Sequence, residues 1–456
     1  MTTYMNDAHA NDTRDFLQVS GEHFAVNGEN VLLRGFGLGS WMNLEHFMIG
    51  LPGTDTMIKQ AFSDVYGPER SGAFFHKFLL EFVDERDFAY LKSLGVNHIR
   101  IPFNYKYFID DQNPETIKEE GFVYLDHVLS LCARFQIYGI LDLHSVPGGQ
   151  NPDWHCDTSS GLPLFWEFGA LRDTVIRLWG HMAQRYRGNP WMGAYDIVNE
   201  PSLVKDAKVF NEFYRKVIAE IRRYDADHII FIEGNAFTTD FSMLDPVDDP
   251  QVAYEFHFYP FVKEPAVLTE EMARPRRREI FKEAFDELLA VRGKYKRPVW
   301  CGELGLVWEP ERIGFLTSIM EDMLELCETN DVSWALWTYK DAACMGIVYP
   351  CEETLWRQLT GRIREGWNQH EEQAKGEALV DYMAATYFKP ISAEMRYPLQ
   401  FRMRTIMQVV CVEQNLKPFL REVPWEDALK LPESFHWDQC ATWGELEVLV
   451  KRCTGA

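Results

Sequence analysis

The sequence predicts an α/β fold: a (β/α)8 TIM barrel followed by a mostly helical C-terminal extension. Eight short apolar runs recur along the chain, and segments with apolar residues at helical spacing separate most of them. Two of these runs end on a glutamate beside a turn signal, Glu200 before Pro201 and Glu303 before Gly305. Alternating strands and helices indicate a parallel barrel, and side chains at the carboxyl ends of its strands form the functional face.

The predicted strands are mostly continuous apolar runs, as expected for parallel strands buried on both faces. They cover residues 31–36, 97–102, 138–144, 193–199, 228–233, 252–259, 298–303 and 332–338. An open doubly wound sheet is the alternative. It is disfavoured because no GxGxxG turn follows the first strand, where residues 35–39 lead into aromatic residues and Glu45 instead of a phosphate-binding helix.

Helices are expected between the strands and after the last one. The helical patterns cover residues 84–94, 123–135, 171–187, 207–224, 278–291, 313–329, 353–388 and 395–412. We therefore divide the chain into a polar N-terminal segment (1–19), a barrel (20–375) and a helical C-terminal extension packed on the barrel (376–456). Within the extension, the stripe of Met403, Ile406, Met407 and Val410 is expected to face the core.

Composition limits the partners. The formal net charge of −23 argues against nucleic acid or an anionic membrane, since both require basic patches. Residues 1–15 are polar and lack the apolar stretch of a secretory signal, and the nine cysteines form no CxxC pair, which predicts reduced thiols and a cytoplasmic protein. The oligomeric state stays open, with a homo-oligomer as one alternative.

One short segment has the residue types of a metal site: Asp153, His155, Cys156 and Asp157. Adjacent residues seldom converge on one ion, because metal ligands are usually spaced further apart. We therefore predict no metal and no cofactor.

Polar and aromatic residues at the predicted strand ends form an ordered set. They are Arg100, His144, Asn199, Glu200, His257, Tyr259, Glu303 and Trp337. This set resembles the active site of glycoside hydrolase family 5, the cellulase family, over about residues 20–350. The resemblance implies a glycosidase with two catalytic carboxylates.

The resemblance also implies a role for each residue. Glu303 would be the nucleophile, aimed by Arg100 and Tyr259, and Glu200 the acid/base. Asn199 would bind the sugar 2-hydroxyl, His144 and His257 would bind sugar hydroxyls and orient Glu200, and Trp337 would form the floor of subsite −1. We expect the pKa of Glu200 to be raised by its enclosure and by the second carboxylate.

Two long loops follow the first and third strands, at residues 40–86 and 145–170. They carry four candidates for substrate contact: Glu45, Gln150, Asn151 and Trp154. Residues 34–43 and 147–151 resemble loops of exo-acting family members. We therefore expect a retaining exo-β-glycosidase that removes terminal β-linked sugars from oligosaccharides or glycoconjugate fragments, with β-mannoside as first choice and β-glucoside as second. An endo-β-1,4-glucanase or endo-β-mannanase is the alternative, and a non-catalytic sugar-binding barrel is disfavoured because both glutamates are present.

Overall fold

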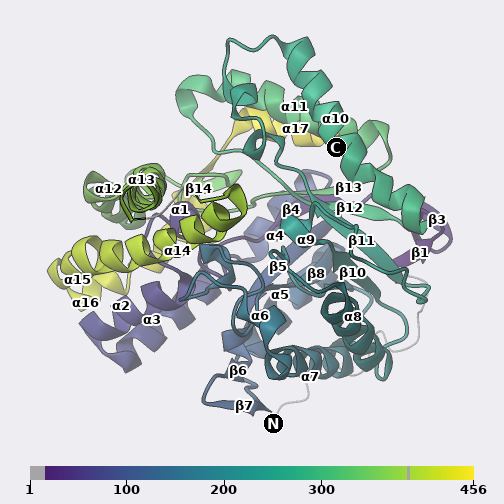
Figure 1. Cartoon of the computed structure of the whole chain (residues 1–456), viewed down its shortest axis with the longest axis horizontal. Helices are drawn as coiled ribbons and strands as arrows, with labels where there is room; N and C mark the ends of the chain where they lie inside the picture. The colour runs from purple at the N-terminus through teal and green to yellow at the C-terminus, as the bar shows by residue number, and fades with distance from the viewer. Residues whose placement is uncertain (1–15, 388–390) are drawn as a thin grey trace.

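The computed structural model describes residues 16–387 and 391–456. Its centre is a closed barrel of eight parallel strands surrounded by helices (Figure 1). The predicted TIM barrel is therefore confirmed. The barrel strands are β4 (Arg34–Gly37), β5 (His98–Asn104), β8 (Tyr138–Ser145), β9 (Met192–Asp196), β10 (Ile229–Glu233), β11 (Val252–His257), β12 (Val299–Leu304) and β13 (Ser333–Leu336).

A small antiparallel sheet precedes the barrel. It consists of β1 (Gln18–Ser20), β2 (His23–Val26) and β3 (Glu29–Val31), so the first predicted strand is divided between β3 and β4. Leu17 and Phe24 are buried with barrel residues such as Trp300, and they close the end of the barrel at which the strands begin. Of the predicted polar segment 1–19, residues 1–15 lie outside the described part, and the domain boundaries stay a prediction.

The six helices predicted between the strands are present as α4 (Glu85–Ser93), α5 (Phe122–Phe135), α7 (Gly169–Tyr186), α8 (Ala207–Arg222), α10 (Arg274–Tyr295) and α11 (Ile313–Thr329). Short helices α6 (Leu164–Glu167) and α9 (Asn235–Thr238) lie in loops above the barrel, and a hairpin of β6 (Ile109–Asp110) and β7 (Asn113–Ile117) follows β5.

The expectation of a long loop at residues 40–86 was wrong, because most of this segment is helical. It forms α1 (His46–Ile49), α2 (Asp55–Tyr66) and α3 (Pro68–Glu81). Two local sequence signals mark the starts of these helices. Thr54 caps α2 by accepting a hydrogen bond from the backbone N–H of Met57, and Pro68 begins α3 directly after Gly67.

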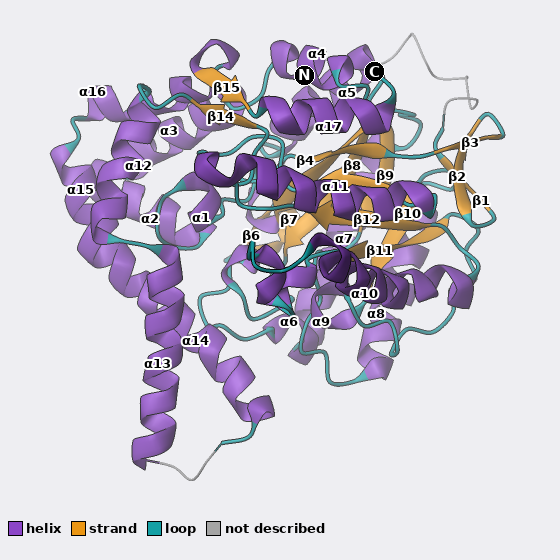
Figure 2. Ribbon diagram, turned by 90° about the horizontal axis from the view of Figure 1, so that it is seen from above, coloured by secondary structure: helices purple, strands orange, loops and turns teal. Residues whose placement is uncertain are grey.

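The C-terminal region is mostly helical, as predicted. It contains α12 (Leu355–Gly366), α13 (Gln369–Tyr387), α14 (Ala393–Cys411), α15 (Lys417–Glu422), α16 (Trp425–Ala428) and α17 (Gly444–Thr454). Strand β15 (Cys440–Thr442) pairs with β14 (Val348–Pro350), which follows the barrel's last strand. Figure 2 shows α13 and α14 side by side, with α13 extending away from the barrel. The predicted core stripe on α14 is wrong in part, because Ile406 and Val410 are 54% and 46% exposed.

Candidate active site

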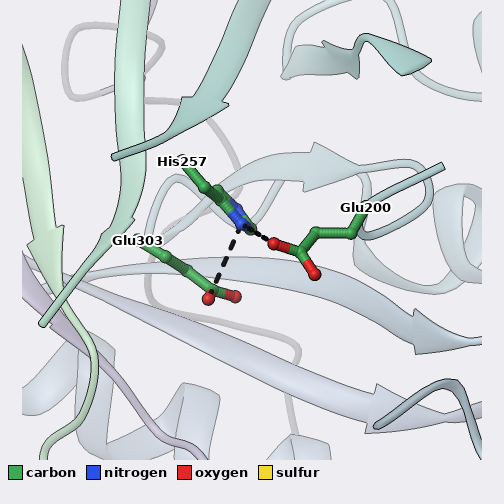
Figure 3. Close-up of side chains that lie close together, drawn as sticks. All are labelled: Glu200, His257 and Glu303. Carbon is green, nitrogen blue, oxygen red and sulfur yellow. Dashed lines mark hydrogen bonds and ion pairs between the residues drawn. The ribbon is translucent and has the colours of Figure 1, made fainter. Parts of the chain in front are cut away.

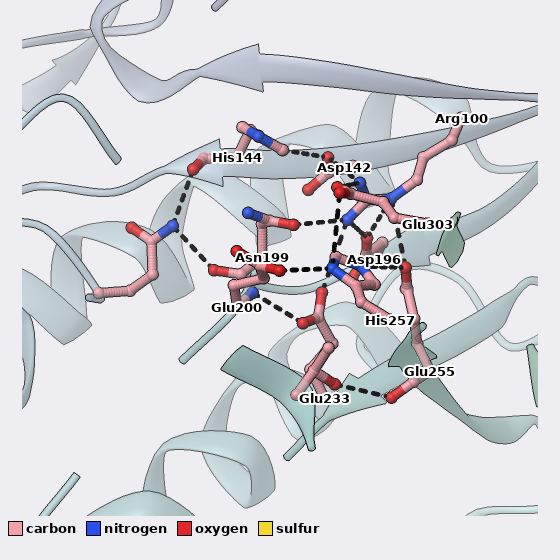
Figure 4. A network of polar contacts seen from close by, with 12 residues as sticks. Arg100, Asp142, His144, Asp196, Asn199, Glu200, Glu233, Glu255, His257 and Glu303 are labelled. Carbon is pink, nitrogen blue, oxygen red and sulfur yellow. Dashed lines mark hydrogen bonds and ion pairs between the residues drawn. The ribbon is translucent and has the colours of Figure 1, made fainter. Parts of the chain in front are cut away.

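Arg100 is the centre of the polar network at the carboxyl ends of the strands (Figure 4). Its side chain, on β5, is fully buried, and its guanidinium lies between carboxylates from five other strands. The nitrogen–oxygen distances are 2.5 Å to Glu303, 2.9 Å to Asp196, 3.2 Å to Asp142, 3.3 Å to Glu255 and 3.6 Å to Glu233. A buried cation of this kind compensates several acids at once, so the geometry of the site depends on it.

The Glu303 carboxylate is held by two donors. Nη1 of Arg100 donates to Oε1 at 2.5 Å, and the Tyr259 hydroxyl donates to Oε2 at 3.0 Å. The preceding residue, Gly302, must lack a side chain because a Cβ there would lie 1.6 Å from Oε1 of Glu255. The three predicted neighbours therefore meet, and Glu303 is fixed in orientation.

The backbone of Glu200 is held in a left-handed conformation, with φ of +50°. Its N–H donates to Oε2 of Glu233 at 2.7 Å, and its carbonyl accepts from Nδ2 of Asn151 at 3.0 Å. Left-handed backbone is costly for a residue with a side chain and persists where surrounding contacts impose it, often at functional sites. These two contacts aim the Glu200 side chain into the barrel mouth.

Two imidazoles flank the Glu200 carboxylate. Nδ1 of His257 lies 2.7 Å from Oε1, and Nε2 of His155 lies 3.1 Å from Oε2. His257 also faces Glu303 at 3.6 Å, so it lies between the two glutamates (Figure 3). A carboxylate oxygen of Glu200 lies within 4.8 Å of one of Glu303.

The ionisation of Glu200 differs from the expectation. Burial raises its pKa, but the hydrogen bonds with His155 and His257 outweigh burial and hold the pKa well below its usual value. Burial lowers the pKa of His257, yet the charges of Glu303 and Glu200 raise it to about 10. The sequence-based expectation weighed enclosure and the second carboxylate but not the effect of the imidazoles on the pKa. It named His257 and His144 as the residues that orient Glu200, whereas the second imidazole on Glu200 is that of His155, and His144 lies against Asp142 and Glu45.

Asn199 and His144 occupy neighbouring strand ends. The Oδ1 atom of Asn199 accepts from Arg100 at 2.8 Å, while its Nδ2 is buried without a hydrogen-bond partner. His144 lies between Asp142, at 2.7 Å, and Glu45, at 3.4 Å; burial lowers its pKa, but Asp142 outweighs burial and the pKa rises to about 10. The Trp337 ring lies parallel to His144, with centroids 5.3 Å apart. Asn199 Nδ2 is therefore free to donate to a ligand hydroxyl.

The four loop candidates occupy different positions. Glu45 is buried in the site, and burial raises the pKa of its carboxyl. Gln150 and Asn151 are fully buried: Gln150 donates to the carbonyls of His144 and Asn199, and Asn151 to that of Glu200. The side-chain amides of Gln150 and Asn151 therefore stabilise the backbone at the strand ends through hydrogen bonds. Trp154 is half-buried and packs on His46, with ring centroids 4.4 Å apart. Substrate contact by these four residues stays a prediction.

Sequence reasoning did not assign five residues of this network. They are Asp142, His155, Asp196, Glu233 and Glu255. For two of them a signal existed, because Asp142 and Glu255 precede His144 and His257 by two residues and so face the same side of their strands. Burial and neighbouring carboxylates raise the pKa of Asp196 and of Glu233 well above the usual values.

The metal-like segment at residues 153–157 does not converge on one point. His155 faces Glu200, Asp157 pairs with Lys106 at 2.9 Å, and Cys156 Sγ donates to the Asn151 carbonyl. Among the described residues, two other groups bring ligand atoms within 4.8 Å of one another: Glu200, His257 and Glu303, and also Glu233, Glu255 and His257. Arg100 lies against carboxylates of both groups and supplies positive charge there.

Comparison with known proteins decides the family. The family described as Cellulase (glycosyl hydrolase family 5) matches residues 71–343. The chain belongs to glycosyl hydrolase family 5. A β-xylosidase of Phanerodontia chrysosporium is 40% identical over 361 residues, which are 75% of each chain. Endoglucanase C of Acetivibrio thermocellus is 26% identical over 300 residues, 57% of this chain and 84% of the endoglucanase. The protein is thus a glycoside hydrolase that acts on carbohydrate.

Solved structures support the same fold. Endoglucanase Cel5A of Thermotoga maritima superposes with a TM-score of 0.50 at 18% identity, covering 69% of this chain and 91% of the endoglucanase. An endogalactoceramidase gives a TM-score of 0.54 at 16% identity, covering 72% and 75%. Across the described residues of this family 5 chain, none of the helices is long and apolar enough to span a bilayer.

Proposed function

We propose that the protein is a retaining exo-β-glycosidase. The observation that carries this proposal is the spacing of Glu200 and Glu303, whose carboxylate oxygens approach within 4.8 Å. Retaining glycosidases hold their two carboxyl groups about 5–5.5 Å apart, while inverting enzymes leave about 6.5–9.5 Å for a water molecule. The short separation therefore favours two displacements with a covalent intermediate.

In the first displacement, an oxygen of Glu303 attacks the anomeric carbon, and the bond to the leaving oxygen breaks. Glu200 gives its proton to that oxygen, which leaves as an alcohol. In the second, Glu200 takes a proton from water, whose oxygen attacks the anomeric carbon and releases Glu303. Arg100 and Tyr259 aim Glu303, and the unpartnered Nδ2 of Asn199 is placed to bind the 2-hydroxyl.

The imidazoles of His155 and His257, which contact Glu200, affect how Glu200 acts as the general acid. With the pKa of His257 raised to about 10, the proton of the free site resides on imidazole and Glu200 is ionised. Proton transfer from His257 to Glu200 along their 2.7 Å contact would supply the acid form. Loss of the Glu303 charge in the covalent intermediate would lower the pKa of His257, because that charge is the main interaction that raises it.

The exo mode is supported by the loop that follows β8. Its backbone is anchored by buried Gln150 and Asn151, and it places His155 beside Glu200 and Trp154 beside His155. The relative at 40% identity is named a β-xylosidase, which favours β-xyloside as first substrate, ahead of the β-mannoside and β-glucoside expected from the sequence. The endo alternative has the named endoglucanases in its favour, at lower identity.

A substrate screen tests the proposal. Aryl β-xyloside, β-mannoside, β-glucoside and β-galactoside identify the sugar, and the hexasaccharide of that sugar then shows the mode. Early products are expected to be monosaccharide and pentasaccharide only. Early di- and trisaccharides would establish endo cleavage, and an inverted anomer in the first NMR spectra would overturn the retaining mechanism. Cytoplasmic location and a homo-oligomer stay predictions, to be tested by fractionation and light scattering.

A further inference from the structure

The C-terminal extension reaches the loop that carries His155. Nη1 of Arg404, on α14, lies 3.8 Å from Oδ2 of Asp153. Further along the same loop, a Cβ on Gly161 would lie only 2.9 Å from the Cα of Arg402, so helix and loop backbones are in direct contact. Figure 2 shows one end of α14 near α6 and α9. The extension therefore contributes to the surroundings of the active site.

A row of aromatic rings leads from Glu200 to α14. The His155 ring, in contact with Glu200, has its centroid 6.2 Å from that of Phe237 on α9. Phe237 lies 6.0 Å from Phe401 of α14, and Phe401 lies 5.0 Å from Tyr397. Burial raises the pKa of Tyr397 to about 12, and the charges of Asp153 and Glu200 add to this effect. We call Phe237, Tyr397 and Phe401 the aromatic surface; Tyr397 is exposed, Phe237 is part-buried, and Phe401 is buried and packs against both.

The position of the aromatic surface indicates which part of a substrate it would meet. Trp337 and Glu303 mark the side on which the terminal sugar would bind. The acid/base must contact the leaving oxygen, so groups beyond Glu200 face the leaving alcohol. His155 lies on Oε2 of Glu200, and the aromatic surface continues outward from His155.

The aromatic surface is apolar, and so is the hairpin around it. Phe237 and Phe401 offer a sugar no hydrogen-bonding group. In the described part of the chain, nine of the sixteen exposed large apolar side chains lie on α13 and α14: Leu379, Tyr382, Met383, Tyr387, Met395, Tyr397, Ile406, Val409 and Val410. Of these side chains, Tyr397 adjoins the row of rings that leads to His155, and an exposed aromatic side chain at the end of such a row favours an apolar ligand.

We propose that α14 and Phe237 form an aglycone subsite for an apolar alcohol, alkyl or aromatic. This inference rests on the proposed β-glycosidase function and adds the class of leaving group. The barrel would select the terminal sugar, and the extension would select what the sugar is attached to. A glycoside of an apolar alcohol would thus be preferred over an oligosaccharide with the same terminal sugar.

A series of n-alkyl β-glycosides tests this directly. Methyl, butyl and octyl glycosides of the sugar chosen in the screen have leaving alcohols of similar acidity, so differences in kcat/KM report aglycone contacts. For the wild type we expect kcat/KM to rise roughly tenfold or more from methyl to octyl, as burial of several methylenes implies. Tyr397→Ala and Phe401→Ala are each expected to reduce that ratio to within about threefold.

The ratio is independent of the fraction of folded enzyme, so partial misfolding of Phe401→Ala does not obscure the result. Val448→Ala, at an apolar residue of α17 that is 69% exposed, is the matched control and is expected to keep the wild-type ratio. An equal octyl-to-methyl ratio in the wild type and both variants would overturn this inference and leave the glycosidase intact. A wild type inactive on every β-glycoside would overturn the proposed function, and this inference with it.

Discussion

Nε2 of His155 lies 3.1 Å from Oε2 of Glu200, on the side of the carboxylate opposite to His257. The same nitrogen lies 2.8 Å from Nδ2 of Asn151, whose other contact is with the Glu200 carbonyl. Asn151 therefore fixes the backbone of the predicted acid/base and lies beside the imidazole; because an amide nitrogen accepts no hydrogen bond, a proton on Nε2 of His155 is donated to Glu200. The loop after β8 therefore contacts both the side chain and the backbone of Glu200, in addition to enclosing it.

This contact predicts a shift in the pH profile. The His155 hydrogen bond lowers the pKa of Glu200, so His155→Phe is expected to raise that pKa and move the basic limb of kcat/KM to higher pH. The limb reports the coupled group of Glu200, His155 and His257. His181→Phe, at a part-exposed histidine of α7 paired with Glu119, is the control. A basic limb that stays in place or moves to lower pH would contradict this role.

A second prediction concerns metal removal. Arg100 supplies the positive charge among the acids of the site, and the two-carboxylate reaction needs no Lewis acid. Dialysis against EDTA is therefore expected to leave kcat and KM unchanged within a factor of about two. Activity lost on dialysis and restored by one added divalent ion would show instead that Glu200, His257 and Glu303 bind a metal.

The third prediction concerns how the extension is attached. Lys340 is fully buried; its Nζ lies 2.5 Å from Asp87 and donates to the carbonyl of Phe435, in the C-terminal extension, at 3.0 Å. Lys340→Met removes one partner of a buried ion pair and is expected to lower the free energy of unfolding by roughly 3–5 kcal/mol.

Urea denaturation measures this loss. Lys451→Met removes only a part-exposed pair with Glu447 and is expected to cost less than about 1 kcal/mol. Equal stability of the Lys340 and Lys451 variants would mean that the buried contacts of Lys340, with Asp87 and with the Phe435 carbonyl, stabilise the fold no more than a part-exposed pair does.

The sequence predicted the strands and the residues at their ends because each strand is a continuous apolar run that stops at a turn signal. Glu303, for example, follows Val299–Cys301 and precedes Gly305. Contacts between distant segments had no comparable signal. The approach of His155 to Glu200 depends on the folded path of a loop. The convergence of five carboxyl groups on Arg100 depends on barrel closure. For α14, the spacing of Met403 and Ile406 indicated a helix but not which face is covered, and Ile406 is exposed.

The central claim is that Glu303 is the nucleophile and Glu200 the acid/base. Glu200→Ala is expected to lower kcat/KM roughly 10²–10⁴-fold on glycosides with poor leaving groups. The decisive measurement is the anomeric configuration of the product formed with azide and a dinitrophenyl β-glycoside. Glu200→Ala is expected to regain turnover and give the β-glycosyl azide, because the intermediate on Glu303 still forms and azide needs no base. Glu303→Ala is expected to give the α-azide or no product. A β-azide from Glu303→Ala, or near-normal hydrolysis by either variant, would contradict the assignment.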